Sequence, residues 1–185
     1  MKFLKKAGIV LAVIIAILLV IPLMVRSEFT LVRETVIHRT KADVFSYLTF
    51  LKNHENFSVW AQADKQAART SRGTDGQVGF VTSWVSQNRF VGSGEQEIRK
   101  IIPGERIDYE LRLFKPIKAT NQSFMKLENF GAEQTKVMWG FQGKIAYPFN
   151  AILLVVKPEK ALGHALDEGL EKMKSVLETK TPPKK

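Results

Sequence analysis

The feature that most constrains this chain is an uncharged apolar run close to its N-terminus, at residues 7–25. As a helix rising 1.5 Å per residue, the run would span about 28 Å, which matches the hydrocarbon core of a bilayer. Pro22 stands near its end, where a proline disturbs a membrane-spanning helix little. The run therefore predicts one N-terminal transmembrane helix.

The charges on the two sides of this run are unequal. Lys2, Lys5 and Lys6 precede it without any acid, whereas Arg26 and Glu28 follow it. Because basic residues are retained on the cytoplasmic side, we expect a cytoplasmic N-terminus and a domain in the periplasm or outside the cell. Two alternatives stay open. One is the reversed orientation, and the other is a cleaved signal peptide, although such peptides have a shorter apolar region and a small-residue cleavage site.

The rest of the chain has the size and composition of one domain. The sequence has 185 residues, so about 160 remain after the anchor, which suits a single domain. It contains no cysteine, which excludes disulfides and thiolate metal sites. The formal charge of +10 favours an anionic partner such as lipid headgroups. Nucleic acid is not expected, because no basic cluster carries interleaved aromatic residues. We divide the chain into a transmembrane anchor with a basic flank (1–28), one folded domain (29–179) and a basic tail (180–185).

Apolar periodicity predicts the elements of this domain in order. A first strand is expected at 29–38, with a slip that turns Val36 inward. A helix capped by Thr40 then runs to about Lys52, and a short second helix follows near 57–60. Residues 62–75 are polar and suit a loop with a weak edge strand. Turn residues then separate five strands, at 79–85, 90–102, 106–114, 118–128 and 135–144.

Strands that follow one another without intervening helices predict an antiparallel meander. In the segment 106–114, alternate residues are apolar and the others are charged or polar, so one face of the sheet meets water and the other needs a cover. The cover is expected to be a helix beginning after Pro158. Its apolar stripe consists of Leu162, Leu166, Leu170, Met173 and Leu177. The expected fold class is thus α+β, with an antiparallel sheet of six to seven strands wrapped around a long C-terminal helix.

Several short stretches carry a family resemblance, together with the order of the elements. These stretches are Val44-Phe45, Asn56-Phe57-Ser58-Val59-Trp60, Gly92-Ser93-Gly94, Thr135-Lys136-Val137-Met138-Trp139 and Glu168-Gly169-Leu170-Glu171-Lys172-Met173-Lys174. Over residues 29–178 the chain resembles the helix-grip domains of the SRPBCC superfamily, in particular its membrane-anchored bacterial branch. That superfamily includes START-type lipid-transfer domains, the birch-pollen allergen proteins and polyketide cyclase/dehydrase-like proteins. One departure is Arg39-Thr40, which replaces the alanine-proline pair that usually begins the first helix.

The resemblance implies a cavity between the sheet and the long helix that accepts apolar ligands. Large apolar walls with a few polar groups suit a small-molecule pocket. Asn121 and Ser123 favour a cavity over a collapsed core, since a buried polar group without a partner costs about 1–3 kcal/mol. A collapsed core stays open as the alternative. The residues expected to form the ligand-binding wall are Trp60, Trp84, Tyr109, Leu111, Asn121, Ser123, Met125, Trp139 and Phe141.

Binding of a lipid-like or other apolar small molecule is therefore the expected function. One alternative is a cyclase/dehydrase-like enzyme, with Tyr109 and Asn121 or an inward-turned Arg89 as the acid/base groups. The other is a non-catalytic envelope scaffold, and the sequence names no protein partner. No catalytic residue, metal site or cofactor is predicted, because the sequence has no metalloprotease, nucleophile-elbow or phosphate-loop motif. His38, His54 and His164 are isolated, and we interpret them as satisfied or solvated side chains.

Residues 150–156 form an unusual apolar, β-branched segment between Pro148 and Pro158. It can be interpreted as a buried short helix that begins the C-terminal element. It can also be interpreted as a gate over the cavity mouth that touches the bilayer. Lys144, Lys157 and Lys160 flank it, which suits an anionic headgroup layer.

Overall fold

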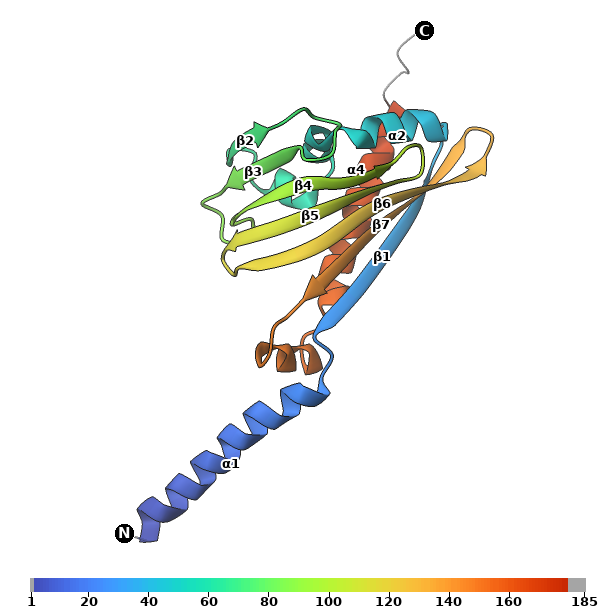
Figure 1. Cartoon of the computed structure of the whole chain (residues 1–185). Helices are drawn as coiled ribbons and strands as arrows, with labels where there is room; N and C mark the ends of the chain where they lie inside the picture. The colour runs from blue at the N-terminus through green and yellow to red at the C-terminus, as the bar shows by residue number, and fades with distance from the viewer. Residues whose placement is uncertain (1, 180–185) are drawn as a thin grey trace.

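A computed structural model describes residues 2–179, so the predicted basic tail at 180–185 lies outside the described residues. An N-terminal helix, α1 (Lys2–Met24), projects away from one folded domain (Figure 1). α1 is long and apolar enough to cross a membrane. The domain contains the strands β1 (Glu28–Ile37), β2 (Ala68–Arg72), β3 (Val81–Val85), β4 (Ser93–Ile102), β5 (Arg106–Lys115), β6 (Ala119–Gly131) and β7 (Gln134–Lys144), with the helices α2 (Lys41–Thr49), η1 (Leu51–Asn56), α3 (Val59–Ala63), η2 (Phe149–Leu154) and α4 (Pro158–Thr179).

The strands form one antiparallel sheet of seven, in the order β1-β7-β6-β5-β4-β3-β2. The sheet curves around α4, and α2 crosses one end of it (Figure 1). This arrangement confirms the predicted α+β fold and its helix-grip layout. The weak edge strand expected within 62–75 is β2, which pairs only with β3 among the described strands.

The predicted slip in the first strand is wrong. β1 pairs with β7 continuously from Glu28–Lys144 to Ile37–Thr135, and Ile37, not Val36, is fully buried. The apolar pattern is interrupted because Arg33, between buried Leu31 and Ile37 on the same face, carries a charge. Its Nε donates to the Asp167 carboxylate at 3.2 Å. The alternation of apolar and polar residues along β1 is therefore interrupted by the inward-facing Arg33, and the register of the strand does not change.

The first helix begins as predicted and ends earlier. The Thr40 side chain accepts a hydrogen bond from the Asp43 amide at 3.2 Å, a standard N-cap. α2 stops at Thr49, and residues 51–56 form the separate 3-10 helix η1. Asp75 explains the break, because its carboxylate accepts from the Leu51 amide at 2.8 Å and the Lys52 amide at 3.3 Å. A side chain distant in sequence thus satisfies the first donors of η1.

The core lies between the inner face of the sheet, α2 and η1, and the apolar stripe of α4. Leu166, Leu170, Met173 and Leu177 are buried, and Leu162 packs at the edge of the same cluster. The predicted cover of the sheet is thus the observed one. The segment 150–156 contains the expected short helix but matches the interpretation as a buried element only in part. Asn150 and Leu153 are buried, whereas most of its other side chains are exposed.

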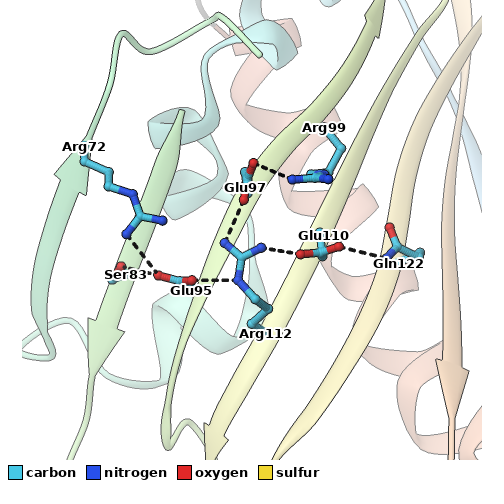
Figure 2. Close-up of polar contacts among 8 residues, drawn as sticks. All are labelled: Arg72, Ser83, Glu95, Glu97, Arg99, Glu110, Arg112 and Gln122. Carbon is cyan, nitrogen blue, oxygen red and sulfur yellow. Dashed lines mark hydrogen bonds and ion pairs between the residues drawn. The ribbon is translucent and has the colours of Figure 1, made fainter. Parts of the chain in front are cut away.

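The outer face of the sheet carries an ion-pair network centred on Arg112 (Figure 2). The Arg112 guanidinium donates to Glu95 at 2.6 Å and to Glu97 at 2.8 Å, both on β4, and to Glu110 on its own strand. The side chains of the four residues are only 15–21% exposed, so solvent screens these pairs weakly. The charge-assisted hydrogen bonds of Arg112 therefore link β5 to β4 on the face of the sheet opposite the core.

Leu170→Ala tests the seating of α4. Leu170 is 1% exposed, so the substitution should lower the free energy of unfolding by about 2–5 kcal/mol. Thermal unfolding of the detergent-solubilised chain, followed by circular dichroism, measures this loss. Glu171→Ala, at the next and exposed position, should stay within about 0.5 kcal/mol. A loss below about 1 kcal/mol at Leu170 would show that α4 is not the cover of the sheet.

Arg112→Ala should lower the free energy of unfolding by about 1.5–3 kcal/mol at neutral pH, because three carboxylates lose their shared cation. Hydrogen bonding from Arg112 holds the pKa of Glu97 below its usual value. A pKa lowered in the folded state stabilises the fold above the unfolded-state pKa, and this contribution disappears as the pH falls through the folded-state pKa. The deficit of Arg112→Ala should therefore shrink below about pH 4, where glutamates protonate.

The matched control is Arg99→Ala, because the Arg99 side chain is 52% exposed and pairs with Glu97 at the surface. It should cost about 0–1 kcal/mol. Thermal unfolding across the acid range compares the two variants. An Arg112→Ala deficit that is the same at neutral and acidic pH would contradict the charged role of Arg112.

Candidate functional site

A cavity of about 220 Å³ lies between the inner face of the sheet and the helices η1, α3 and α4. Its walls are mostly apolar. The loops that join β3 to β4 and β5 to β6 contribute exposed lining residues, Phe90 and Pro116, and these border its opening to solvent. The side chains that line it are Leu51, His54, Glu55, Ser58, Trp60, Ala61, Arg69, Thr82, Trp84, Phe90, Val91, Gln96, Leu111, Leu113, Lys115, Pro116, Ser123, Trp139, Phe141, Leu162 and Leu166.

Trp139 forms a fixed part of the wall. Its Nε1 donates to Ser123 Oγ at 3.2 Å, and Ser123 Oγ in turn donates to the Gly140 carbonyl at 2.9 Å. Gly169 of α4 makes room for the indole, because a Cβ there would lie 2.7 Å from Trp139 Cζ3. The Phe57 ring packs against the indole edge-to-face at 5.7 Å. Trp139 is thereby held between the sheet and α4 by both packing and hydrogen bonds.

The mouth depends on a close approach between two loops. Gly92 has φ +60°, and a Cβ on it would lie 2.0 Å from the Lys115 carbonyl oxygen. Only glycine fits this contact, which holds the β3–β4 loop against the β5–β6 loop. Phe90 stands on the first loop and is 92% exposed, so an aromatic ring borders the opening.

His54 is the unusual polar group of the cavity. It is 6% exposed, and its Nε2 has no hydrogen-bond partner among the described residues. The Phe57 and Tyr109 rings lie 5.0 Å away, centre to centre. Burial lowers the pKa of His54 to about 3, so the imidazole is neutral near neutral pH. A neutral imidazole has one hydrogen-bond donor and one acceptor, and the Nε2 of His54 is itself shielded from solvent.

The structure distributes the predicted wall residues over two groups. Trp60, Trp84, Leu111, Ser123, Trp139 and Phe141 line the cavity, whereas Tyr109, Asn121 and Met125 are buried outside its lining. The Tyr109 hydroxyl donates to the Leu48 carbonyl at 3.3 Å, and burial raises its pKa. Ser123 has partners of its own, so the expected shortage of hydrogen bonds at this serine is wrong.

Sequence reasoning missed His54, which it treated as satisfied or solvated. A signal was present, because Leu51, His54 and Phe57 recur at a spacing of three. That spacing places them on one face of a 3-10 helix, where side chains three residues apart eclipse. All three are buried. The spacing could therefore have indicated that His54 lies on the buried, apolar face of a short 3-10 helix.

Comparison of the fold with solved structures finds similar proteins in several bacteria. A crystal structure of a protein from Mesorhizobium loti matches with TM-score 0.59 and 14% identity, covering 83% of this chain and 100% of that one. One from Chromobacterium violaceum matches with TM-score 0.56 and 13% identity, covering 82% and 98%. A solution structure from Thermobifida fusca matches with TM-score 0.55 and 18% identity, covering 80% and 92%. No family model and no curated protein sequence matches the chain. These similarities show a shared fold, namely an antiparallel sheet with a long C-terminal helix, and leave the activity to the site itself.

His54→Leu tests the cost of the unpartnered imidazole. Without a ligand, the variant should keep or gain stability, by up to about 1–3 kcal/mol, because a buried nitrogen without a partner is removed. The unchanged chain should also lose stability as the pH falls from about 6.5 towards 3, since the unfolded histidine binds a proton that the folded one excludes. The variant should lack this part of the acid sensitivity. Thermal unfolding between neutral and acidic pH measures both effects, with exposed His164→Leu as control. A destabilised His54→Leu would contradict an unpartnered imidazole.

Proposed function

We propose that the chain is a membrane-anchored binding domain of the SRPBCC kind, whose cavity accepts a lipid-like or other apolar small molecule. The observation that carries the proposal is the cavity itself, with mostly apolar walls, a bordered mouth and one neutral histidine. Such a combination of apolar surface with a few polar groups is typical of small-molecule sites. In this proposal α1 crosses the membrane with its N-terminus in the cytoplasm, and the domain lies in the periplasm or outside the cell.

The size of the cavity limits the occupant. Its volume of about 220 Å³ is below the range of about 300–1,000 Å³ for drug-sized ligands. A small apolar molecule, or one segment of a longer lipid chain with the remainder in the mouth, fits this volume. The cavity lining also holds polar side chains, among them His54, Ser58 and Gln96, that can bond a hydroxyl or carboxyl group on the ligand.

Binding is supported better than catalysis by the positions of the candidate acid/base groups. The Tyr109 hydroxyl is bonded to the Leu48 carbonyl and lies outside the cavity lining, as does Asn121. Arg89 is exposed on the β3–β4 loop and is not turned inward. The groups considered for a cyclase-type reaction are therefore not assembled around the cavity.

Leu113→Trp tests the proposal by filling the cavity. Leu113 is half-buried in the wall, so the added ring atoms should occupy ligand space and weaken binding at least about tenfold, or about 1.4 kcal/mol. The assay is displacement of an apolar fluorescent probe, N-phenyl-1-naphthylamine, by fatty acids on the detergent-solubilised chain. Thermal unfolding confirms that the variant is folded.

The matched control is Val78→Trp, because Val78 is 60% exposed and lies outside the cavity lining. It should bind the probe like the unchanged chain. If the unchanged chain takes up neither probe nor fatty acid at micromolar concentration, the binding function is wrong and the scaffold alternative is favoured. Equal binding by both tryptophan variants would place the ligand elsewhere.

A further inference from the structure

The segment from Tyr147 to Val156, here called the η2 foot, exposes an unusual amount of apolar surface. It follows β7 and contains η2, and none of its side chains lines the cavity. The interpretation of this segment as a gate is therefore not supported by its position. Neighbouring exposed apolar residues of this kind mark an interaction surface. Their exposed fractions are Phe149 74%, Ile152 51%, Leu154 61%, Val155 85% and Val156 48%.

The η2 foot is bonded to the end of α1. Asn150 Nδ2 donates to the Pro22 carbonyl at 2.8 Å and to the Val25 carbonyl at 2.9 Å. The Tyr147 hydroxyl donates to the Leu19 carbonyl at 3.0 Å. Figure 1 shows the same arrangement, with η2 at the end of the domain where α1 leaves it. The foot is thus fixed beside the last turns of the apolar helix.

These bonds satisfy groups that water cannot reach in a membrane. The last carbonyls of a helix lack their regular intrahelical partner, and the Pro22 carbonyl has only a 3.3 Å bond from the Val25 amide within this segment. An unpaired backbone group in hydrocarbon costs several kcal/mol. The Asn150 side chain is buried and supplies a donor to two carbonyls at this helix end. These two hydrogen bonds from Asn150 therefore pair the backbone carbonyls of a helix end that lies near the hydrocarbon boundary.

The hydrogen bonds also give the depth of the foot. Leu19 lies six residues before Val25, or about 9 Å along a helix. Among residues 5–24 of α1, Pro22 is buried and the others are exposed, so the contact with the domain is limited to the end of the helix. If residues 7–25 occupy the hydrocarbon core, Tyr147 reaches below its outer boundary and η2 lies close to that boundary. The exposed apolar side chains of the foot then meet lipid rather than water.

The charges around the foot suit an anionic headgroup layer. Exposed Lys144, Lys157 and Lys160 flank it, and Arg26 lies at the exit of α1. Two carboxylates partly offset them, since Lys144 pairs with Glu28 at 3.0 Å and Arg26 pairs with Glu159. Four cations against two carboxylates leave a positive collar, which anionic lipids attract.

We infer that the η2 foot is a second membrane-inserting element, which seats the domain at fixed height and orientation on a bilayer containing anionic lipids. This inference rests on the part of the proposed function in which α1 spans the membrane. It is independent of what the cavity binds.

The chain has no cysteine, so single labels can be placed without altering native residues elsewhere. Phe149→Cys and Val155→Cys place an environment-sensitive nitrobenzoxadiazole label on the foot of the full chain, reconstituted into phosphatidylcholine/phosphatidylglycerol vesicles. Ile14→Cys, in the middle of the apolar run, reports whether α1 spans. Phe130→Cys is the matched control, because Phe130 is 60% exposed near the end of β6. The turn that joins β6 to β7 lies far from α1 in Figure 1.

Lipids that carry a nitroxide high on the acyl chain should quench the labels at 149 and 155 strongly. A nitroxide deep in the chain should quench the label at 14, and neither lipid should quench the label at 130. Asn150→Ala in the Phe149→Cys background should reduce quenching at 149 and leave position 14 unchanged, because the bonds to α1 are lost.

Quenching at 14 without quenching at 149 and 155 would overturn the foot and leave the membrane span intact. No quenching at any of the three positions would overturn both the span and the foot. Foot labels that are shielded from aqueous iodide but not quenched by lipid would show a protein surface covering the segment, which also overturns the inference.

Discussion

The packing of α4 against the inner face of the sheet is the contact on which the rest of the structure depends. One helix covers a sheet of seven strands, and its buried stripe from Leu166 to Leu177 supplies much of the core. A single helix is narrower than such a sheet, so it cannot fill the whole concave face. The space that remains beside Leu162 and Leu166 is completed by η1 and α3, and this space is the cavity. The cavity is therefore a consequence of how the core is covered rather than a separate addition to it.

The two faces of the sheet differ in how completely their polar side chains are paired. On the outer face, Arg112 gathers three carboxylates, so each charge has a partner and the strands are cross-linked. On the inner face, Ser123 is satisfied by Trp139 and by the backbone, whereas His54 keeps a nitrogen without a partner. A buried polar atom of this kind is costly, and native proteins keep few of them. The contrast is between an outer face whose charges are paired and an inner face on which one buried imidazole nitrogen has no partner among the described residues.

Much of the fold could be predicted from the sequence because its signals are local. Alternation in the β5 region, the cap at Thr40 and the apolar stripe of α4 each require only neighbouring residues. The failures involve partners distant in sequence. The early end of α2 depends on Asp75, and the inward Arg33 depends on Asp167. The position of the η2 foot beside α1 depends on the bonds of Asn150. The same limit applies to the site. Alternation placed Trp139 and Ser123 on the inner face, but it could not tell which inward residues reach the cavity and which, like Tyr109 and Met125, are covered by the helices.

The short passage from α1 to β1 restricts where the domain can act. Three residues separate the end of α1 at Met24 from the start of β1 at Glu28, and the Ile145 amide already bonds the carbonyl of Ser27. A long flexible linker would let the domain move over a wide volume around the end of α1. This short joint instead keeps the domain next to the end of α1. With α1 in a bilayer, its encounters become essentially two-dimensional. Any molecule that enters the cavity must come to the membrane surface, or diffuse laterally within the leaflet next to the domain. A molecule that resides in the same membrane would then reach the domain by lateral diffusion, without first leaving the leaflet.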